Sequence, residues 1–339
     1  FWFFDSLDRR LLNTDYFFVQ RLTDTKEEEK RLEFYHENLI EVGWILKNQC
    51  SKSELKALIG KFCKQKEEKL YFKGILEADC KDYIVINFGG VDNMLINASI
   101  YPRVILNLLL PAIRKVKKQM TVLVIGGGDT LRDIRESKNE PFENGVWIGT
   151  VPPEWALYLV ANASNYFLSC GLSSLIEMGL YSRNGFGLPS QNYSQHCQIK
   201  KFRDLYKNWE SFDYYDYNKE FVVPDFIPEK DGVRIVQQSF IDFVENENAK
   251  DYFQQKVEAY LEKSEKAIQI SEELHMNCRD GAQEIADILY KDLFKDNYRK
   301  IIFAENKNGD TSLFRALYKN SVEEFVQSIE GDCNIAPPR

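Results

Sequence analysis

Residues 165–179 read NYFLSCGLSSLIEMG. An apolar run is followed by Gly171, and a second apolar stretch with helical spacing begins at Leu172. This order predicts a buried strand that turns directly into a helix. The N–H groups in the first turn of a helix have no intrahelical partners. Together with the hydroxyls of Ser173 and Ser174, these groups suit an anion such as a diphosphate.

A carboxylate follows the two serines on the same predicted helix. Glu177 stands three residues after Ser174, about one helical turn along. We therefore expect Glu177 to face ligand hydroxyls above the phosphate site. The alternative is structural, because the serines would cap the helix and Glu177 would be the capping-box partner of Ser174. This stretch alone leaves both interpretations open.

The same strand-to-helix pattern recurs along the chain. Apolar runs that suit buried strands alternate with stretches of helical length or spacing. This alternation predicts the α/β class, with a doubly wound, Rossmann-like parallel sheet covered on both faces. We expect Ser53 to cap the first helix without a capping box. The predicted strands are residues 1–4, 16–20, 83–88, 121–125, 146–149, 166–169, 185–188 and 221–223, and the predicted helices are 53–68, 100–116, 172–179 and most of 230–294.

Several of these strands end in glycine-containing turns, including Gly89-Gly90 and residues 126–128. In parallel α/β sheets, ligands bind outside the carboxyl ends of the strands. The turn at 126–128 resembles a dinucleotide fingerprint, G-x-G-x-x-G/A, but its last position is Leu131. Glu143, about 20 residues on, lies in a polar stretch rather than at a strand end. A nicotinamide oxidoreductase is therefore disfavoured by this stretch.

Residues 185–198, GFGLPSQNYSQHCQ, combine a short strand with a proline loop rich in amides. Gln191, Asn192 and Gln195 follow the strand directly. Amide side chains both donate and accept hydrogen bonds, so they suit the vicinal hydroxyls of a sugar. The alternative is a polar surface loop.

Composition restricts the classes of function. The chain has 339 residues, 44% of them hydrophobic, and a net charge of −8, which argues against a nucleic-acid-binding surface. Its seven cysteines form no C-x-x-C pair, and its three histidines are far apart. We therefore expect free thiols, a cytoplasmic location and no metal site. No apolar run reaches the length of a membrane span, so none is predicted.

The segment 146–198 resembles the donor-binding half of nucleotide-sugar glycosyltransferases of the GT-B fold. Their signature is a glycine turn, then Ser or Thr, then Glu three residues later, then a proline loop. Here Gly171, Ser174 and Glu177 follow that spacing, and Pro189 and Gln195 come at a compatible distance. Two positions depart from the family: Ser169 stands where many members have His, and Ser194 where many have an acidic residue.

The resemblance implies a metal-independent glycosyltransferase without a cofactor. Its substrates would be a nucleotide diphosphate sugar, such as a UDP-sugar, and an unknown acceptor. The base would stack on Val151 and Pro152, the diphosphate would bind at 171–174, and the ribose would face Glu177. The sugar would meet the loop 191–195. The implied donor-binding residues are Gly89, Gly90, Val151, Pro152, Ser169, Gly171, Ser173, Ser174, Glu177, Gln191, Asn192 and Gln195.

The resemblance also suggests three regions. Residues 1–50 are expected to be the end of an N-terminal acceptor-type domain with its linker, 51–295 the nucleotide-sugar-binding domain, and 296–339 a helical tail. Most of the acceptor domain would lie outside this sequence, so no general base is named, although His36 and His196 are candidates. Residues 306–335 resemble one ankyrin repeat, which suggests a protein partner; a terminal helical hairpin is the alternative.

Other functions fit parts of the pattern. A nucleotide-sugar hydrolase or epimerase on the same fold would use the same donor site, and turnover without an acceptor would distinguish it. A non-catalytic binding or scaffold module would fit the ankyrin-like end and the missing acceptor domain. A nicotinamide oxidoreductase is the third alternative.

Overall fold

The computed structural model of the chain divides into two compact units. The smaller unit contains β1 (Phe17–Gln20), β2 (Leu39–Val42) and α12 (Gly281–Leu293). β1 and β2 pair in parallel, and the first turn of α12 is held next to β2 because Glu284 accepts a hydrogen bond from the Gly43 N–H at 2.8 Å. The structure describes residues 17–20, 39–45, 50–78, 82–89, 100–127, 129–136, 142–181, 185–206, 209–224, 227–263 and 280–293.

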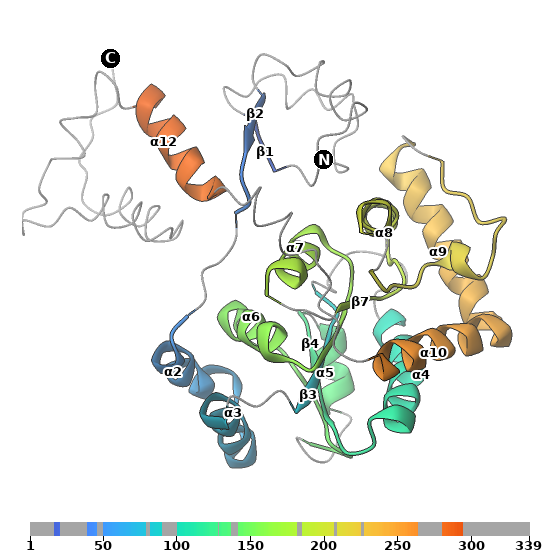
Figure 1. Ribbon diagram of the computed structural model, residues 1–339, viewed down its shortest axis with the longest axis horizontal. Helices are drawn as coiled ribbons and strands as arrows, with labels where there is room; N and C mark the ends of the chain where they lie inside the picture. Colours follow the sequence, from blue (N-terminus) through green and yellow to red (C-terminus); the bar gives the residue numbers. More distant parts are fainter. Residues whose placement is uncertain are drawn as a thin grey trace, which may run out of the picture. The chain divides into compact units, whose positions relative to one another are not determined.

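The larger unit is built on a five-stranded parallel sheet with the order β5-β4-β3-β6-β7 (Figure 1). The chain enters the sheet at its centre, runs outward to one edge, and then returns to the other side of the first strand. The strands are β3 (Tyr83–Asn87), β4 (Thr121–Ile125), β5 (Val146–Gly149), β6 (Asn165–Leu168) and β7 (Gly185–Gly187).

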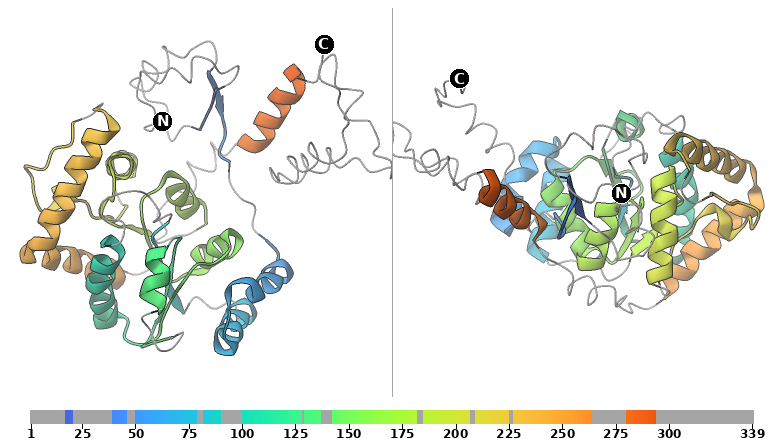
Figure 2. Two further views of the ribbon diagram at one scale, coloured as in Figure 1. Left: turned by 180° about the vertical axis from the view of Figure 1, so that it is seen from behind. Right: turned by 90° about the horizontal axis from the view of Figure 1, so that it is seen from above.

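Helices cover both faces of this sheet (Figures 1 and 2). One face carries α2 (Lys52–Phe62), α3 (Lys66–Ala78), α6 (Pro153–Asn162) and α7 (Leu172–Tyr181). The other carries α4 (Tyr101–Val116), α5 (Asp129–Glu136), α9 (Glu229–Glu245) and α10 (Glu247–Glu262). α8 (Tyr193–Leu205) follows β7 and leads to a short 3₁₀ helix, η3 (Tyr214–Asp216).

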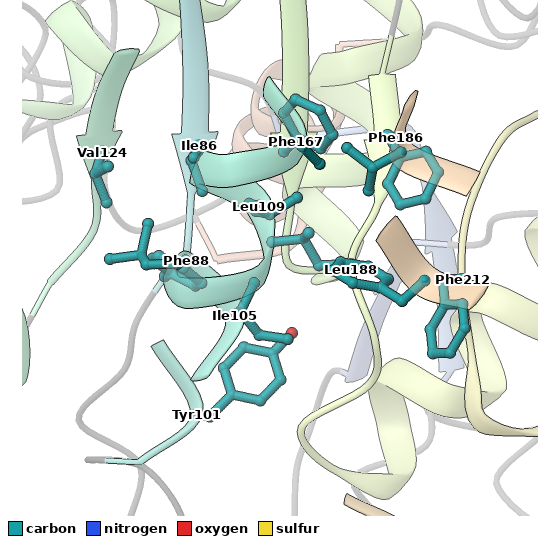
Figure 3. Close-up of a cluster of buried hydrophobic side chains, with 14 of the residues drawn as sticks. Ile86, Phe88, Tyr101, Ile105, Leu109, Val124, Phe167, Phe186, Leu188 and Phe212 are labelled. Atoms are coloured by element: carbon teal, nitrogen blue, oxygen red, sulfur yellow. The ribbon is translucent and has the colours of Figure 1, made fainter. Parts of the chain in front are cut away.

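The two faces have different cores. On the first face, aromatic rings meet edge to face, with the Phe72 ring centroid 5.1 Å from that of Trp147 and 5.3 Å from that of Trp155. On the second face, Ile86, Val124 and Phe167 from the sheet pack with Leu109 of α4 in one buried cluster (Figure 3). Burial of both faces explains why the strands read as continuous apolar runs rather than as alternating patterns.

The predicted α/β class and parallel sheet are confirmed, and the predicted strands 83–88, 121–125, 146–149, 166–169 and 185–188 match the sheet within one residue at each end. The predicted strand at 221–223 is wrong, because these residues form an irregular segment. Strand β2 and helices α5, α6 and α8 were not predicted. The expected strand at 1–4 lies outside the described residues.

The predicted single helix at 53–68 is also wrong, because the structure has two helices there. α2 begins with a capping box, in which Ser51 and Glu54 bond each other's backbone, so neither the cap at Ser53 nor its lack of a box is correct. α3 begins after a break at 63–65. The break forms because the Glu68 carboxylate accepts hydrogen bonds from the N–H groups of Lys64 and Gln65 at 2.9 and 3.1 Å.

Candidate functional site

The strand order reverses between β3 and β6, which are neighbours in the sheet. After β3 the chain moves toward β4 and β5, and after β6 it moves toward β7 on the other side. The turns after β3 and β6 therefore diverge, and in parallel α/β sheets such a point is the usual position of a ligand. Gly89 follows β3, and Gly171 follows β6, so two of the predicted glycine turns border the reversal point.

The start of α7 lies at this point. The Leu175 N–H donates to the Gly171 carbonyl at 3.0 Å, so Gly171 occupies the N-cap position. In the part of the chain that the structure describes, the N–H groups of Leu172, Ser173 and Ser174 contact no protein acceptor. Donors without partners at the start of a helix can bind an anion.

Glu177 lies one turn further along α7 and is half-buried. Burial raises the pKa of its carboxyl group, and among the described residues the carboxylate has no hydrogen bond or ion pair. The capping-box alternative is wrong, because Gly171 holds the N-cap position and Ser174 is already the third helical residue. A half-buried carboxylate without a structural partner is a candidate functional group.

Sequence reasoning missed two polar residues on β3 and β6, the strands between which the strand order reverses. Asn87 ends β3, and its Oδ1 atom accepts a hydrogen bond from the Gly89 N–H at 2.8 Å, which holds Gly89 at a φ of +64°. Its Nδ2 atom donates to the Tyr166 hydroxyl at 3.1 Å. An Asn followed closely by Gly-Gly is a known turn signal that could have singled out Asn87. Tyr166 stands in an apolar strand and gave no such signal.

The glycine turn after β4 is tightly packed. A Cβ atom on Gly126 would lie 2.7 Å from the Leu131 side chain and 3.1 Å from the Gly89 carbonyl oxygen. Leu131 is fully buried in the core. Leu131 occupies the position where a dinucleotide fingerprint has a small residue. That small residue lets the helix pack closely against the strand.

Val151 and Pro152 follow β5, the edge strand of the sheet, and both are half-buried. The Pro152 carbonyl accepts the N–H of Trp155 at 2.9 Å and so begins α6. Thr150 donates to the Gly126 carbonyl at 2.9 Å, which joins the turns after β5 and β4. Three strand spacings, about 14 Å, separate β5 from β6, so a ligand that contacts both turns has to lie along the carboxyl edge of the sheet.

The loop after β7 is held by a buried hydrogen-bond network. Tyr101 donates to the Pro189 carbonyl at 2.5 Å, and Tyr214 donates to the Ser190 carbonyl at 2.7 Å. The Ser190 hydroxyl donates to Asp213 at 2.8 Å. His196 contacts the other oxygen of the same carboxylate through Nδ1 at 2.5 Å. His196 is buried and has this structural partner, so its arrangement does not match that of an accessible general base.

The amides of this loop have specific structural partners. Asn192 caps α8, since its Oδ1 accepts the Gln195 N–H at 2.9 Å. Gln195 Oε1 accepts the Gln191 N–H at 2.9 Å, and Gln191 Nε2 donates to the Ser169 hydroxyl at 2.8 Å. Gln191 Oε1 and Gln195 Nε2 remain without a hydrogen bond among the described residues. One acceptor and one donor are thus left for a ligand.

Some predicted features lie outside the described residues, namely Gly90, His36 and the ankyrin-like segment 306–335. Within the residues that are described, no cluster of three or more His, Cys, Asp or Glu side chains is arranged to hold a metal ion. Metal independence stays a prediction. No described helix has both the length and the apolar character needed to cross a membrane.

A groove of about 180 Å³ lies between α2 and α3. Lysine side chains and Leu76 make up most of its walls, and it contains none of the predicted site residues. We assign it no role in the site. Its lining residues are Lys52, Ser53, Lys56, Lys73, Leu76 and Glu77.

Comparison with known proteins found no matching family model and no matching curated protein. Among solved structures, the chain is similar to TarM, with 13% sequence identity over 80% of this chain and 45% of that chain, at a TM-score of 0.33. It is also similar to Arabidopsis thaliana UGT89C1 in complex with quercetin, with 10% identity over 79% of this chain and 60% of that chain, again at a TM-score of 0.33. The chain therefore spans about half the length of these structures.

Proposed function

We propose that the larger unit binds a nucleotide diphosphate sugar and belongs to a glycosyltransferase of the GT-B type. The observation that carries this proposal is the pairing of unpartnered N–H groups at the start of α7 with the unpartnered, half-buried Glu177 one turn further on. The first group suits a diphosphate, and the second suits the hydroxyls of a ribose. Both lie where the strand order reverses, which is the usual ligand position in such sheets.

The chemistry assigned to this site is stabilisation of the leaving nucleoside diphosphate. Negative charge builds up on the β-phosphate as the bond to the sugar breaks. The N–H groups of Leu172, Ser173 and Ser174 and the positive end of the α7 dipole would stabilise that charge without moving. The base would lie on Val151 and Pro152 at the end of β5. The acceptor and the general base remain unassigned.

The packing around Gly126 supports this assignment over a nicotinamide oxidoreductase. The fully buried Leu131 stands where a dinucleotide fingerprint has Gly or Ala, and the Gly127 N–H of this turn already donates to the Gly89 carbonyl at 2.9 Å. The diphosphate is therefore assigned to the turn after β6 rather than to the turn after β4. Thermal-shift measurements with a panel of nucleoside diphosphates, NAD(H) and NADP(H) test this choice.

We expect UDP or another nucleoside diphosphate to raise the melting temperature, because a ligand that binds only the folded state stabilises it. NAD(H) and NADP(H) are expected to leave the melting temperature unchanged. A shift with the nicotinamide nucleotides and none with any nucleoside diphosphate would contradict the proposal.

The sugar is assigned to Gln191 and Gln195. Replacing Gln195 with Ala is expected to lower affinity for the intact nucleotide sugar and to leave affinity for the bare nucleoside diphosphate nearly unchanged. The reason is that a site built to bond hydroxyls loses binding energy when one buried partner is removed. Titration calorimetry with both ligands gives the ratio of the two dissociation constants.

Loss of Gln195 Oε1 also removes the acceptor of the Gln191 N–H, so Gln195→Glu serves as the matched variant. Glu keeps an oxygen that can accept the Gln191 N–H, and it has a second acceptor oxygen where Gln195 has the Nε2 donor. If the ratio of dissociation constants is the same in wild type, Gln195→Ala and Gln195→Glu, the loop does not contact the sugar.

A further inference from the structure

α2 and α3 lie side by side in the larger unit, and lysines of both helices line the groove between them (Figure 1). Lys52 and Lys56 on α2 and Lys73 on α3 form part of its wall. Lys66 and Lys69 continue this row toward the start of α3, because residues three, four or seven apart lie on one side of a helix. We call these five lysines the basic face.

The basic face contributes little to the stability of the fold. Lys56, Lys66 and Lys73 are exposed, and among the described residues they make no hydrogen bond or ion pair. Lysines four residues apart on a helix, such as Lys69 and Lys73, repel each other and destabilise the helix slightly. Of the residues that line the groove, only Glu77 is acidic. An anionic partner would relieve this repulsion.

An exposed apolar side chain lies among these lysines. Leu70 is 60% exposed. It comes four residues after Lys66 and three before Lys73, so the three side chains share one side of α3. Lysine has a long stem, so its ammonium group can reach lipid headgroups while a neighbouring leucine enters the boundary between headgroups and acyl chains. The combination therefore suits the surface of a membrane with anionic lipids.

The acidic side of the larger unit lies across the sheet from the basic face. α9 and α10 carry eight acidic and four basic residues and cover the other face of the sheet (Figure 2). The two helical layers are roughly 20 Å apart, because each layer packs about 10 Å from the next. This separation exceeds the Debye length of about 8 Å in physiological salt. The net charge of −8 therefore does not prevent a local attraction to an anionic surface.

We propose that the basic face binds the surface of an anionic lipid membrane and that Leu70 enters the headgroup region. The lysines are spread along two helices, which suits a partner with a continuous layer of negative charge. An acidic polypeptide in the groove is the alternative, but Leu70 is not among the residues that line the groove. Membrane binding by α2 and α3 needs no ligand at the donor site, so it goes beyond the proposed function.

Co-sedimentation of the full chain with lipid vesicles measures this binding. Vesicles of phosphatidylcholine alone are compared with vesicles that also contain about 30% phosphatidylserine. We expect the chain to sediment with the anionic vesicles and to remain in solution with the neutral ones. Binding should weaken as the salt concentration rises, because salt screens the charges. Equal binding to both kinds of vesicle, or no binding to the anionic ones, would overturn the proposal.

Removal of two lysines tests the role of the basic face. Lys66→Gln combined with Lys73→Gln should weaken binding to the anionic vesicles about 25-fold, since each basic residue near such a surface contributes about fivefold. The matched control is Lys219→Gln combined with Lys230→Gln, which removes the same charge from exposed positions outside α2 and α3. The control should stay within about twofold of the wild type. Equal losses would mean that binding follows net charge alone and that the basic face has no special role.

Leu70→Ala distinguishes a membrane from an acidic polypeptide. The substitution should weaken binding to the anionic vesicles about fivefold, because less apolar surface enters the headgroup region. Val222→Ala is the matched control, since Val222 is 70% exposed and lies outside the basic face. Soluble polyglutamate is the second probe, and we expect it to bind more weakly than the anionic vesicles. Vesicle binding that Leu70→Ala leaves unchanged, or tighter binding of polyglutamate, would overturn the proposal.

Discussion

Replacement of Glu68 by Ala is expected to lower the free energy of unfolding by about 3–5 kcal/mol, the usual cost of removing one partner from a buried ion pair. The Glu68 side chain is fully buried. One of its oxygens accepts hydrogen bonds from Arg135 and from Trp147 Nε1. The other accepts the N–H groups of Lys64 and Gln65, which come just before α3. The substitution therefore leaves a guanidinium, an indole N–H and two backbone donors without an acceptor.

Denaturant unfolding at neutral pH measures this effect, and Glu67→Ala is the matched control. Glu67 precedes Glu68 on the same helix and is exposed, so its loss should change stability by less than about 0.5 kcal/mol. Similar values for the two variants would mean that the Glu68 contacts contribute little to stability.

The contribution of Glu68 should depend on pH. Burial acts to raise its pKa, but hydrogen bonds from the Gln65 N–H and Trp147 and the charge of Arg135 outweigh burial, so its pKa lies below the ordinary value. A carboxyl group with a lowered pKa in the folded state stabilises at neutral pH and loses this contribution as the pH falls. The difference between wild type and Glu68→Ala should therefore shrink in acid.

Replacement of Glu177 by Ala is expected to weaken nucleoside diphosphate binding about 10- to 100-fold, the equivalent of roughly 1.5–3 kcal/mol for hydrogen bonds to a charged group. Stability should fall little, because Glu177 caps no helix and has no polar partner among the described residues. Calorimetric titration and denaturant unfolding on the same variant measure the two effects. A large drop in stability with unchanged affinity would make Glu177 a structural residue.

Comparison of the wild type with Glu177→Gln shows whether the negative charge of Glu177 stabilises or destabilises the folded state. Burial raises the pKa of this carboxyl group, so the folded state disfavours its charged form. The wild type should therefore lose stability, relative to Glu177→Gln, as the pH rises above about 4.3, the ordinary value for Glu. At pH 7 the variant should melt at a higher temperature than the wild type, and near pH 3.5 the difference should vanish. A higher melting temperature for the wild type at pH 7 would contradict this assignment.

The strands and turns of the sheet could be predicted from sequence because they are local features. Apolar runs such as 121–125 are bounded by glycine or polar residues, so each strand and its turn are visible together. The strand order depends on packing between segments that are distant in the sequence, so local sequence patterns could not predict it. The break between α2 and α3 was missed although Glu68 accepts the neighbouring Lys64 and Gln65 N–H groups; the contacts of Glu68 with Trp147 and Arg135, far along the chain, could not be read from the sequence.

The candidate site could be predicted only in part. The spacing of Gly171, Ser174 and Glu177 was visible in the sequence, but the absence of a capping box became visible only in the structure. Asn192 was assigned to a sugar on its residue type, whereas the structure has it as the N-cap of α8. The pair of Asn87 and Tyr166 could not be found, since 78 residues separate the two positions in the sequence.

The central claim is that a diphosphate binds at the turn after β6 and not at the turn after β4. Backbone amide chemical shifts of a chain labelled with ¹⁵N in Gly and Ser measure both turns in one titration with UDP. We expect the signals of Gly171, Ser173 and Ser174 to move as the ligand saturates and those of Gly126 and Gly127 to stay in place. Movement of Gly126 and Gly127 with no change at Gly171, Ser173 and Ser174 would contradict the account.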